Sequence, residues 1–220
     1  MPEVGGPVGI LGGTFDPIHH GHLRLAQEAR DHLQLNGVRL IPSGQPPHRG
    51  VPGATPAHRL AMTRLACADN PAFVVDDAEI LATGPSYTVT TLERLRALYG
   101  PQRPLVLLLG ADAFLGLEAW HRWETVFDLA HVAVATRPSH RLAPEHMTPA
   151  LAGCCRSRTH HDPALLRQAP AGTVLPFAIT ALDVSATAIR TALQTGGNPR
   201  YLLPGAVLDY IAQHRLYSAT

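Results

Sequence analysis

The chain is poor in cysteine, in aromatic residues and in net charge. Its 220 residues include 3 cysteines, 5% aromatic residues and a formal net charge of +1. An odd cysteine count with the adjacent pair Cys154 and Cys155 does not make a disulfide framework and favours a reducing compartment. An RNA-binding module needs basic stripes interleaved with aromatic residues, which this composition disfavours. We therefore expect no nucleic-acid partner.

Long hydrophobic runs are also missing. No apolar run reaches the ~18 residues that a membrane-spanning helix needs, and the first residues lack the charged and then apolar segments of a secretory signal. The sequence therefore predicts a cytoplasmic protein with no membrane partner. Hydrophobic residues nevertheless make up 45% of the chain and charged residues 16%, a composition that builds a packed core. At this length we expect a single domain over residues 1–220.

Short apolar runs bounded by Gly and Pro alternate with amphipathic stretches along the chain. The runs predict buried parallel strands at Val8–Leu11, Val38–Ile41, Phe73–Val75, Leu105–Leu109, Val132–Ala135 and Val174–Phe177. The amphipathic stretches predict helices at His22–Leu35, Pro56–Ala68, Thr88–Leu98 and Ser185–Leu193. This alternation predicts an α/β fold, a doubly wound parallel sheet of Rossmann-like type. Such sheets bind ligands beyond the carboxyl ends of their strands.

Two segments break the alternation. Pro42–Pro56 is rich in Pro and Gly, which predicts a loop that covers the site. Ser139–Thr173 mixes Pro, His and Arg and predicts a peripheral excursion. Its His160-His161-Asp162 cluster is a weak metal-site candidate, because adjacent side chains diverge and no fourth ligand is apparent.

The strongest candidate site follows the first predicted strand, at Gly12-Gly13-Thr14-Phe15-Asp16-Pro17-Ile18-His19-His20-Gly21-His22. A strand, a glycine turn and a helix start together place backbone N–H groups and the positive end of a helix where an anion can dock. His19 and His22 add two imidazoles, which can donate to phosphate oxygens without carrying a full charge. The stretch therefore indicates a site for a nucleoside triphosphate.

Other interpretations of the histidines stay open at this point. Three histidines in four residues are compatible with a metal cluster, although no carboxylate or cysteine stands nearby at ligand spacing. His19 and His22 are also compatible with simple packing residues. His20 is expected to be an exposed spacer.

The segment resembles the HxGH signature of the nucleotidylyltransferase superfamily. With Gly12-Gly13-Thr14-Phe15-Asp16-Pro17 in front of it, it resembles bacterial nicotinate-nucleotide adenylyltransferases in particular. Further matches follow in order along the chain, at Ile41-Pro42, Pro46-Pro47-His48-Arg49, Gly84-Pro85-Ser86-Tyr87-Thr88, Thr91-Leu92, Gly110-Ala111-Asp112, Trp120 with Trp123, Arg137-Pro138, Val184-Ser185-Ala186-Thr187-Ala188-Ile189-Arg190 and the tail from Tyr210-Ile211 to His214-Arg215-Leu216-Tyr217.

The resemblance implies a fold of nucleotidylyltransferase type and a reaction. The adenylyl group of ATP is transferred to nicotinate mononucleotide, which gives nicotinate adenine dinucleotide and pyrophosphate in NAD biosynthesis. Mg²⁺ is expected because ATP brings it, and no dedicated metal site is expected in the protein. Such a reaction needs no covalent protein intermediate, so that catalysis is mostly positioning and stabilisation of charge.

The resemblance also assigns residues to the two substrates. The catalytic group comprises His19, His22 and Arg190. The ATP site comprises Gly12, Gly13, Thr14, Phe15, His19, His22, Gly110, Asp112, Ser185, Thr187 and Arg190. The mononucleotide site comprises Arg49, Tyr87, Thr88, Trp120 and Arg137.

The segment Val184 to Arg190 also has a physical reason to bind an anion. Ser185 at a helix start caps the helix and leaves hydroxyl and N–H groups facing outward, and Arg190 can return to the same end as Thr187. Taken alone, this pattern is an ordinary helix cap. The second serine of the family pattern is Ala186 here, so that the role of that hydroxyl does not carry over.

Several other positions depart from the family pattern or allow a second interpretation. Arg49 stands where the family commonly has a lysine, and a solvated loop charge is an equal alternative. Trp120 offers a flat face to a pyridine ring, whereas either tryptophan could instead anchor the core. Ala82-Thr83 replaces a basic residue and Thr90 an acidic one, which weakens the inference of a preference for the acid over the amide.

Three competing functions remain. The first is an adenylyltransferase for another acceptor, either nicotinamide mononucleotide or phosphopantetheine. The second is a nucleotide-binding regulatory module without turnover. The third is the RNA-binding module that the composition disfavours. The oligomeric state is not predicted by the sequence.

Overall fold

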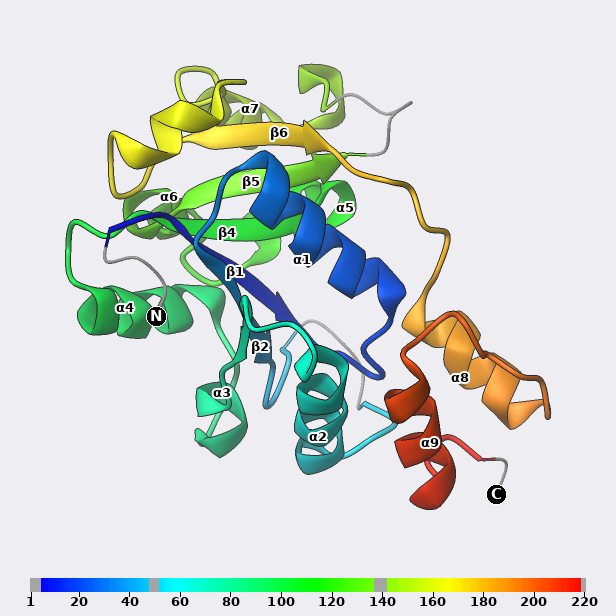
Figure 1. Cartoon of the computed structure of the whole chain (residues 1–220). Coiled ribbons are helices and arrows are strands. Elements are labelled where there is room, and N and C mark those ends of the chain that lie inside the picture. Colours follow the sequence, from blue (N-terminus) through cyan, green and yellow to red (C-terminus); the bar gives the residue numbers. More distant parts are fainter. Residues whose placement is uncertain (1–4, 48–51, 137–141, 219–220) are drawn as a thin grey trace. The chain divides into compact units, whose positions relative to one another are not determined.

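A computed structural model describes residues 5–47, 52–136 and 142–218, without the side chain of Pro144 (Figure 1). The strands are β1 (Val8–Gly13), β2 (Gly37–Pro42), β3 (Phe73–Val75), β4 (Leu105–Gly110), β5 (His131–Thr136) and β6 (Val174–Ala178). The helices are α1 (His20–His32), α2 (Pro56–Cys67), α3 (Ala78–Leu81), α4 (Thr88–Tyr99), α5 (Ala111–Leu115), α6 (Val126–Leu129), α7 (Pro149–Cys155), α8 (Ala186–Gln194) and α9 (Gly205–Gln213). Short 3₁₀ turns are η1 (Leu117–Ala119), η2 (Trp123–Thr125), η3 (Pro144–His146) and η4 (Pro163–Arg167).

Within the described residues, six strands form one parallel sheet in the order β3-β2-β1-β4-β5-β6. Parallel pairing sets Val8 opposite Leu105 and Leu107 opposite Val132. From β1 the chain adds β2 and β3 on one side and then β4, β5 and β6 on the other, so that the strand order switches between β1 and β4. In doubly wound folds the ligand-binding crevice lies at such a switch point. The predicted fold class, all six predicted strands and the four predicted helices are confirmed, with shifts of a few residues at their ends.

The chain divides into two compact units, each built from separate segments. The first comprises Met1–Leu11, Leu25–Arg39 and Tyr87–Ala181, and the second comprises Gly12–Arg24, Leu40–Ser86 and Leu182–Thr220. The expectation of one domain over residues 1–220 stays a prediction.

The first unit is organised around β4, β5 and β6, which lie side by side in Figure 1. Residues Leu105–Leu109 and Val132–Ala135 are buried in near-continuous apolar runs, as strands covered on both faces require. Arg96 near the end of α4 donates to the carbonyls of several surrounding loops, namely those of Gly100, Pro101, Arg103, Leu129 and Pro170. One guanidinium thereby gives hydrogen bonds to backbone acceptors in several loops.

The second unit packs α2 against α9, which Figure 1 shows as neighbouring helices. Thr55 caps α2 by accepting from the His58 N–H at 3.4 Å. Arg59 is fully buried in α2 and donates to the carbonyl oxygens of Thr14 at 2.7 Å, Gly44 at 3.0 Å and Ala54 at 3.3 Å. The loop after β2 and the turn after β1 are therefore both held by one side chain.

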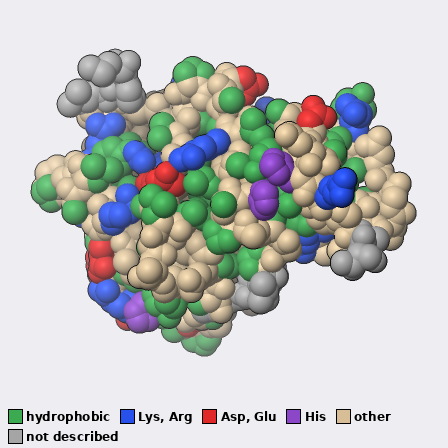
Figure 2. All heavy atoms as spheres, turned by 90° about the horizontal axis from the view of Figure 1, so that it is seen from below, with side chains coloured by type: hydrophobic (Ala, Val, Ile, Leu, Met, Phe, Trp, Pro, Cys, Tyr) green, Lys and Arg blue, Asp and Glu red, His purple; other side chains and the backbone are tan. Residues whose placement is uncertain are grey.

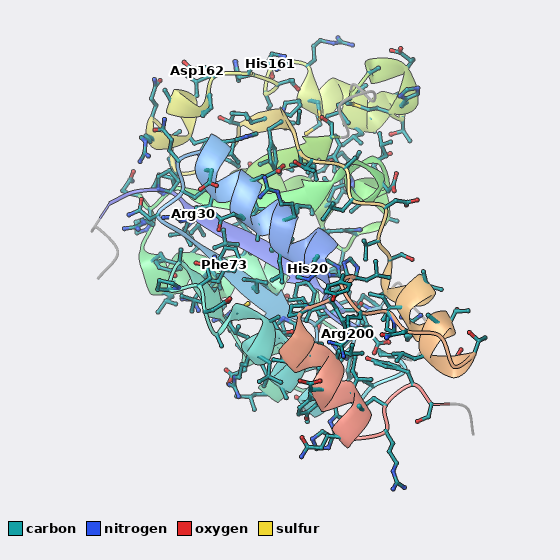
Figure 3. All side chains as sticks on the ribbon, turned by 45° about the vertical axis from the view of Figure 1, so that its right-hand side comes forward. His20, Arg30, Phe73, His161, Asp162 and Arg200 are labelled. Atoms are coloured by element: carbon teal, nitrogen blue, oxygen red, sulfur yellow. The ribbon has the colours of Figure 1, made fainter. Side chains whose placement is uncertain are left out.

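The segment 139–173 lies between β5 and β6 and, from residue 142, forms η3, α7 and η4. His161 and Asp162 are exposed on the approach to η4 (Figure 3), and the Asp162 carboxylate accepts from the Ala164 N–H at 2.9 Å. Asp162 therefore acts as the cap of η4. Among the described residues, no helix has both the length and the apolar composition to cross a bilayer.

Candidate active site

The turn after β1 is built by two residues with special backbone requirements. Phe15 has a positive φ of 49° and a buried ring, a conformation that is uncommon for a bulky residue and marks constrained turns. A Cβ on Gly13 would lie 2.8 Å from that ring. The close approach of the Phe15 ring therefore requires glycine at position 13.

His19 and His22 lie together, as their spacing predicts. Their rings stack with centroids 3.7 Å apart, and the Phe15 ring lies edge-on to His22 at 5.0 Å. The His19 N–H donates to Nδ1 of His22 at 3.3 Å. When His22 is neutral, this bond assigns its proton to Nε2, which can then donate to an anion.

Gly21 explains why the two rings can approach so closely. A Cβ at this position would lie 3.0 Å from the His19 ring, tighter than ordinary contact. The glycine between the histidines therefore makes room for the imidazole of His19, in addition to the room for a ligand that the sequence suggested.

Burial and, to a smaller extent, the nearby His20 together lower the pKa of His19 to about 4. Its Nδ1 is buried and has no hydrogen-bond partner among the described residues. His19 is therefore a neutral imidazole at physiological pH with one nitrogen left unsatisfied, which costs free energy unless a ligand or water meets it.

The start of α1 differs in part from the expectation of open amide groups. The His20 N–H donates to the Leu202 carbonyl at 3.0 Å, and the N–H groups of His22 and Leu23 bond to the His19 carbonyl. His20 is half-buried at the beginning of α1 (Figure 3) and not fully exposed as its spacer role suggested. The imidazoles, more than the helix amides, are the donors that this turn offers.

The second predicted phosphate motif begins α8. Ser185 is the N-cap, and its Oγ accepts from the Ala188 N–H at 3.1 Å. The first-turn amides of Ala186 and Thr187 have no acceptor within the helix. Arg190 donates from Nη2 to the Thr187 hydroxyl at 3.3 Å. The predicted return of Arg190 to the helix start is confirmed.

Arg190 also reaches the turn that carries the histidines. Its Nη1 donates to the Asp16 carbonyl at 2.7 Å and lies 3.7 Å from the Asp16 carboxylate. Asp16 stands three residues before His19, so that two motifs 174 residues apart meet within the second unit. A cation, two imidazoles and a helix start gathered in this way are groups that can bind a polyanion.

Three residues at this site, Asp16, Arg59 and Tyr217, were not predicted as functional. Asp16 is buried and bonds to the loop residues Gly53 and Ala54 and to Tyr217, and Arg59 holds the neighbouring carbonyls. Asp16 and Tyr217 lie in motifs that carry the family resemblance, but neither motif by itself indicates that the two side chains meet.

The remaining candidates belong to the first unit or to residues outside the described ranges. Gly110 caps α5, and Asp112 is exposed in its first turn. Thr88 begins α4, and the Tyr87 ring lies 4.5 Å from that of His121. Trp120 and Trp123 are both half-buried, so that neither is a fully buried core anchor. Arg49 and Arg137 lie outside the described residues.

Ser86 contributes to the loop after β2. Its Oγ accepts from the Gly44 N–H at 2.9 Å and from the Gln45 N–H at 3.2 Å, and its own N–H donates to the Gln45 carbonyl at 2.9 Å. Between the end of β2 at Pro42 and the start of α2 at Pro56, the described residues form no helix or strand, as predicted. Its Gly53 and Ala54 amides approach the histidine turn through Asp16.

Metal binding by the protein itself would require His, Cys, Asp or Glu side chains that lie close together. Among the described residues, no three His, Cys, Asp or Glu side chains are gathered as a metal site.

On the face that Figure 2 shows, basic and acidic side chains lie among one another, in keeping with the net charge of +1. Anion binding therefore depends on local placement of donors and not on a field over the whole surface.

Comparisons with known proteins agree with this geometry. Residues 10–192 match the cytidylyltransferase-like family. A "Probable nicotinate-nucleotide adenylyltransferase" of Dechloromonas aromatica is 54% identical over 96% of this chain and 97% of its own length, and one of Halorhodospira halophila is 49% identical over 96% and 94%.

The fold is also similar to that of a solved structure. The nicotinic acid mononucleotide adenylyltransferase of Plasmodium falciparum, complexed with NaAD, is 16% identical with a TM-score of 0.70 and covers 96% of this chain and 97% of its own. At that identity the likeness shows the fold alone. The family match and the identity to the bacterial relatives show more: the chain belongs to the cytidylyltransferase-like family and, within it, to the nicotinate-nucleotide adenylyltransferases.

Proposed function

We propose that this protein transfers the adenylyl group of ATP to nicotinate mononucleotide, which yields nicotinate adenine dinucleotide and pyrophosphate for NAD biosynthesis. The names of the bacterial relatives support this reaction, and so do the solved Plasmodium falciparum structures, whose ligands are NaAD and APC. It is the function that the phosphate-binding geometry supports best.

One observation carries the proposal. Arg190 of α8 donates to the Asp16 carbonyl, in the turn that continues to the stacked His19 and His22. A guanidinium and two imidazoles thus share one small region, although their motifs are far apart in the sequence. Three nitrogen donors gathered at a helix start suit a triphosphate better than a neutral ligand.

The chemistry follows from these donors. A phosphate oxygen of nicotinate mononucleotide attacks the α-phosphorus of ATP, forming one P–O bond while the bond from that phosphorus to the leaving pyrophosphate breaks. Negative charge grows on the pyrophosphate and on the non-bridging oxygens. His19, His22 and Arg190 stabilise this charge by donating hydrogen bonds that are in place before the reaction.

The other predicted residues complete the two substrate sites in this proposal. Gly12, Gly13, Thr14 and Phe15 shape the turn against the phosphates, and Ser185 and Thr187 add hydroxyl donors from α8. Gly110 and Asp112 meet the ATP ribose. Tyr87, Thr88, Trp120, Arg49 and Arg137 bind the mononucleotide, with the Trp120 indole against the pyridine ring.

We propose that Mg²⁺ enters as part of the MgATP substrate. The triphosphate supplies oxygen ligands of the kind that Mg²⁺ prefers, and the exposed carboxylate of Asp112 suits contact with a hydrated ion. The ion would neutralise charge on the leaving phosphates. We also propose a cytoplasmic location, because Cys67, Cys154 and Cys155 are all free thiols.

A pyrophosphate-release assay tests the function. We expect turnover with ATP and nicotinate mononucleotide that exceeds turnover with nicotinamide mononucleotide or phosphopantetheine. Faster turnover with the amide or with phosphopantetheine would replace the acceptor, and binding of ATP without any turnover would support a regulatory module.

His22→Ala tests the site in the same assay. Loss of one fixed donor lowers turnover by about 10² to 10³. His20→Ala is the matched control, since it removes an imidazole from the same helix start without touching the stacked pair. An unchanged rate in His22→Ala, or an equal loss in both variants, would contradict the role assigned to His22.

A further inference from the structure

Asp16 is a buried residue, with 5% of its surface exposed, yet its side chain carries a carboxylate. A buried carboxylate is costly unless donors surround it. Oδ2 accepts from the Gly53 N–H at 2.8 Å, and Oδ1 accepts from the Ala54 N–H at 3.0 Å and from the Tyr217 hydroxyl at 2.6 Å. Three hydrogen bonds and the nearby Arg190 guanidinium thus satisfy the group.

Tyr217 is shaped to make this contact. The residue is buried, with 8% of its surface exposed, and its φ of 59° is in the left-handed region, which is unfavourable for an aromatic residue. A Cβ on Gly53 would lie 3.1 Å from the Tyr217 ring. The backbone near the end of the chain therefore adopts a costly conformation that turns the ring inward against residue 53 and the hydroxyl onto Asp16.

The protonation state of Tyr217 suits a donor. Burial raises the pKa of the phenol, and the hydrogen bond to Asp16 raises it further. Tyr217 thus remains protonated at physiological pH and donates to the carboxylate. The contact is a strong one, because hydrogen bonds to ionised acceptors are shorter and about twice as strong as neutral bonds.

Asp16 connects Tyr217 to Arg190. The Asp16 backbone carbonyl accepts from Nη1 of Arg190 at 2.7 Å, and the carboxylate lies 3.7 Å from the same nitrogen. Nη2 meets the Thr187 hydroxyl. The guanidinium is therefore fixed on one side by Asp16 and on the other by the start of α8.

We propose that Tyr217 is a positioning residue for adenylyl transfer: its hydroxyl fixes Asp16, and Asp16 in turn holds the Arg190 guanidinium in the orientation that meets the triphosphate. The inference rests on the proposed function. It extends the site to a side chain near the end of the chain that need not touch substrate.

The test is a double-mutant cycle between Tyr217→Phe and Arg190→Ala. The phenylalanine keeps the ring and removes the hydroxyl donor. We expect Tyr217→Phe to lower kcat about tenfold with Arg190 present and to change it less than about twofold in the Arg190→Ala background, because coupled residues are not additive. The KM for nicotinate mononucleotide should change less than about twofold.

Tyr210→Phe is the matched control. Tyr210 also lies near the end of the chain, and its hydroxyl meets Nδ1 of His58 at 2.9 Å, in the packing of α9 on α2. We expect this variant to keep the kcat of the parent protein. A comparable loss of kcat in both tyrosine variants would show general destabilisation and overturn the proposal.

Two further measurements apply if Tyr217→Phe does not fold or if the parent protein shows no turnover. If Tyr217→Phe does not fold at the assay temperature, the cycle is run with Asp16→Asn in its place, and the same non-additivity is expected. An equal effect in both Arg190 backgrounds, or no effect at all, refutes the positioning role. If the parent protein shows no turnover, the proposed function fails, and the cycle is measured as the Kd of a non-hydrolysable ATP analogue, where non-additivity still supports the role of Tyr217.

Discussion

The imidazole of His19 stays neutral over the physiological pH range because it is buried. Its pKa is about 4 in the folded protein, against 6.5 for an unperturbed histidine. A neutral ring can donate to a phosphate from one nitrogen while the other accepts, whereas a protonated ring at this position would carry an uncompensated buried charge. Burial of His19 therefore serves binding and sets a limit on stability at low pH.

We expect the protein to lose stability at low pH because of His19. Between about pH 6.5 and about pH 4 the unfolded chain binds a proton at His19 that the folded protein does not, so that stability falls as the pH is lowered through this window. The full loss amounts to about 3 kcal/mol. We expect His19→Gln to lose stability less steeply than the parent protein from pH 7 to pH 4.5, as measured by urea unfolding.

The comparison between the two proteins isolates His19. Burial also lowers the pKa of His131, which adds a loss of the same sign, but His131 is present in both proteins. Parallel stability curves for His19→Gln and the parent would contradict the assignment.

At the scale of elements, the start of α8 has two roles that a single substitution can separate. Ser185 caps the helix, and the same helix start is proposed to meet the triphosphate. Aspartate caps a helix about as well as serine, yet its charge opposes a polyanion. Stability and affinity for ATP should therefore respond differently to the same change.

We predict that Ser185→Asp changes the free energy of unfolding by less than ~0.5 kcal/mol, since both residues are good caps. It should raise the KM for ATP at least about tenfold, because like charges about 4 Å apart near a protein surface repel by ~4 kcal/mol. Thermal unfolding and initial rates measure the two effects. Thr55→Asp, at the equivalent cap of α2, is the control and should leave the KM unchanged.

At the scale of the whole molecule, hydrogen bonds from one side chain connect several loops of the first unit. Arg96, in the last turn of α4, donates to five backbone carbonyls of the first unit. Burial lowers the pKa of its guanidinium without approaching neutrality. Lysine has one donor group in place of this fork and cannot reach the same set of acceptors.

We predict that Arg96→Lys lowers the free energy of unfolding by ~2 to 3 kcal/mol, because several part-buried carbonyls lose their donor at the same time. Urea unfolding measures the change. Arg64→Lys is the control, since the ion pair of Arg64 with Asp77 is exposed and pairs of this kind contribute ~0 to 1 kcal/mol. A loss in Arg96→Lys no larger than in Arg64→Lys would contradict the role of Arg96.

The sheet of this molecule could be predicted because its strands are short apolar runs bounded by Gly and Pro. The placement of His19 and His22 beside the start of α1 and the return of Arg190 to Thr187 could also be predicted from local spacing, whereas the stacking of the two rings was not predicted. The helices α3, α5, α6, α7 and α9 were not predicted. The first four span only four to seven residues and show little periodicity. The assignment of Arg49, Tyr87, Thr88, Trp120 and Arg137 to the mononucleotide remains a prediction.

Contacts between distant parts of the chain were the main gap. Nothing in the pattern around Asp16 indicates that its carboxylate meets Tyr217, 201 residues further on. Pairwise contacts at such separations depend on the packed tertiary structure, and neither propensity nor spacing encodes them locally. The sequence thus predicted Arg190 and Thr187 but missed their connection to Asp16 and Tyr217.

The large sequence separation between Asp16 and its partners has a consequence for how the protein becomes active as it folds. The partners of Asp16 come from residues 53–54, 190 and 217, and long-range closures of this kind are slow to form during folding. Refolding from denaturant should therefore restore the helical circular dichroism signal before it restores catalysis, and an early folded population would be compact yet inert.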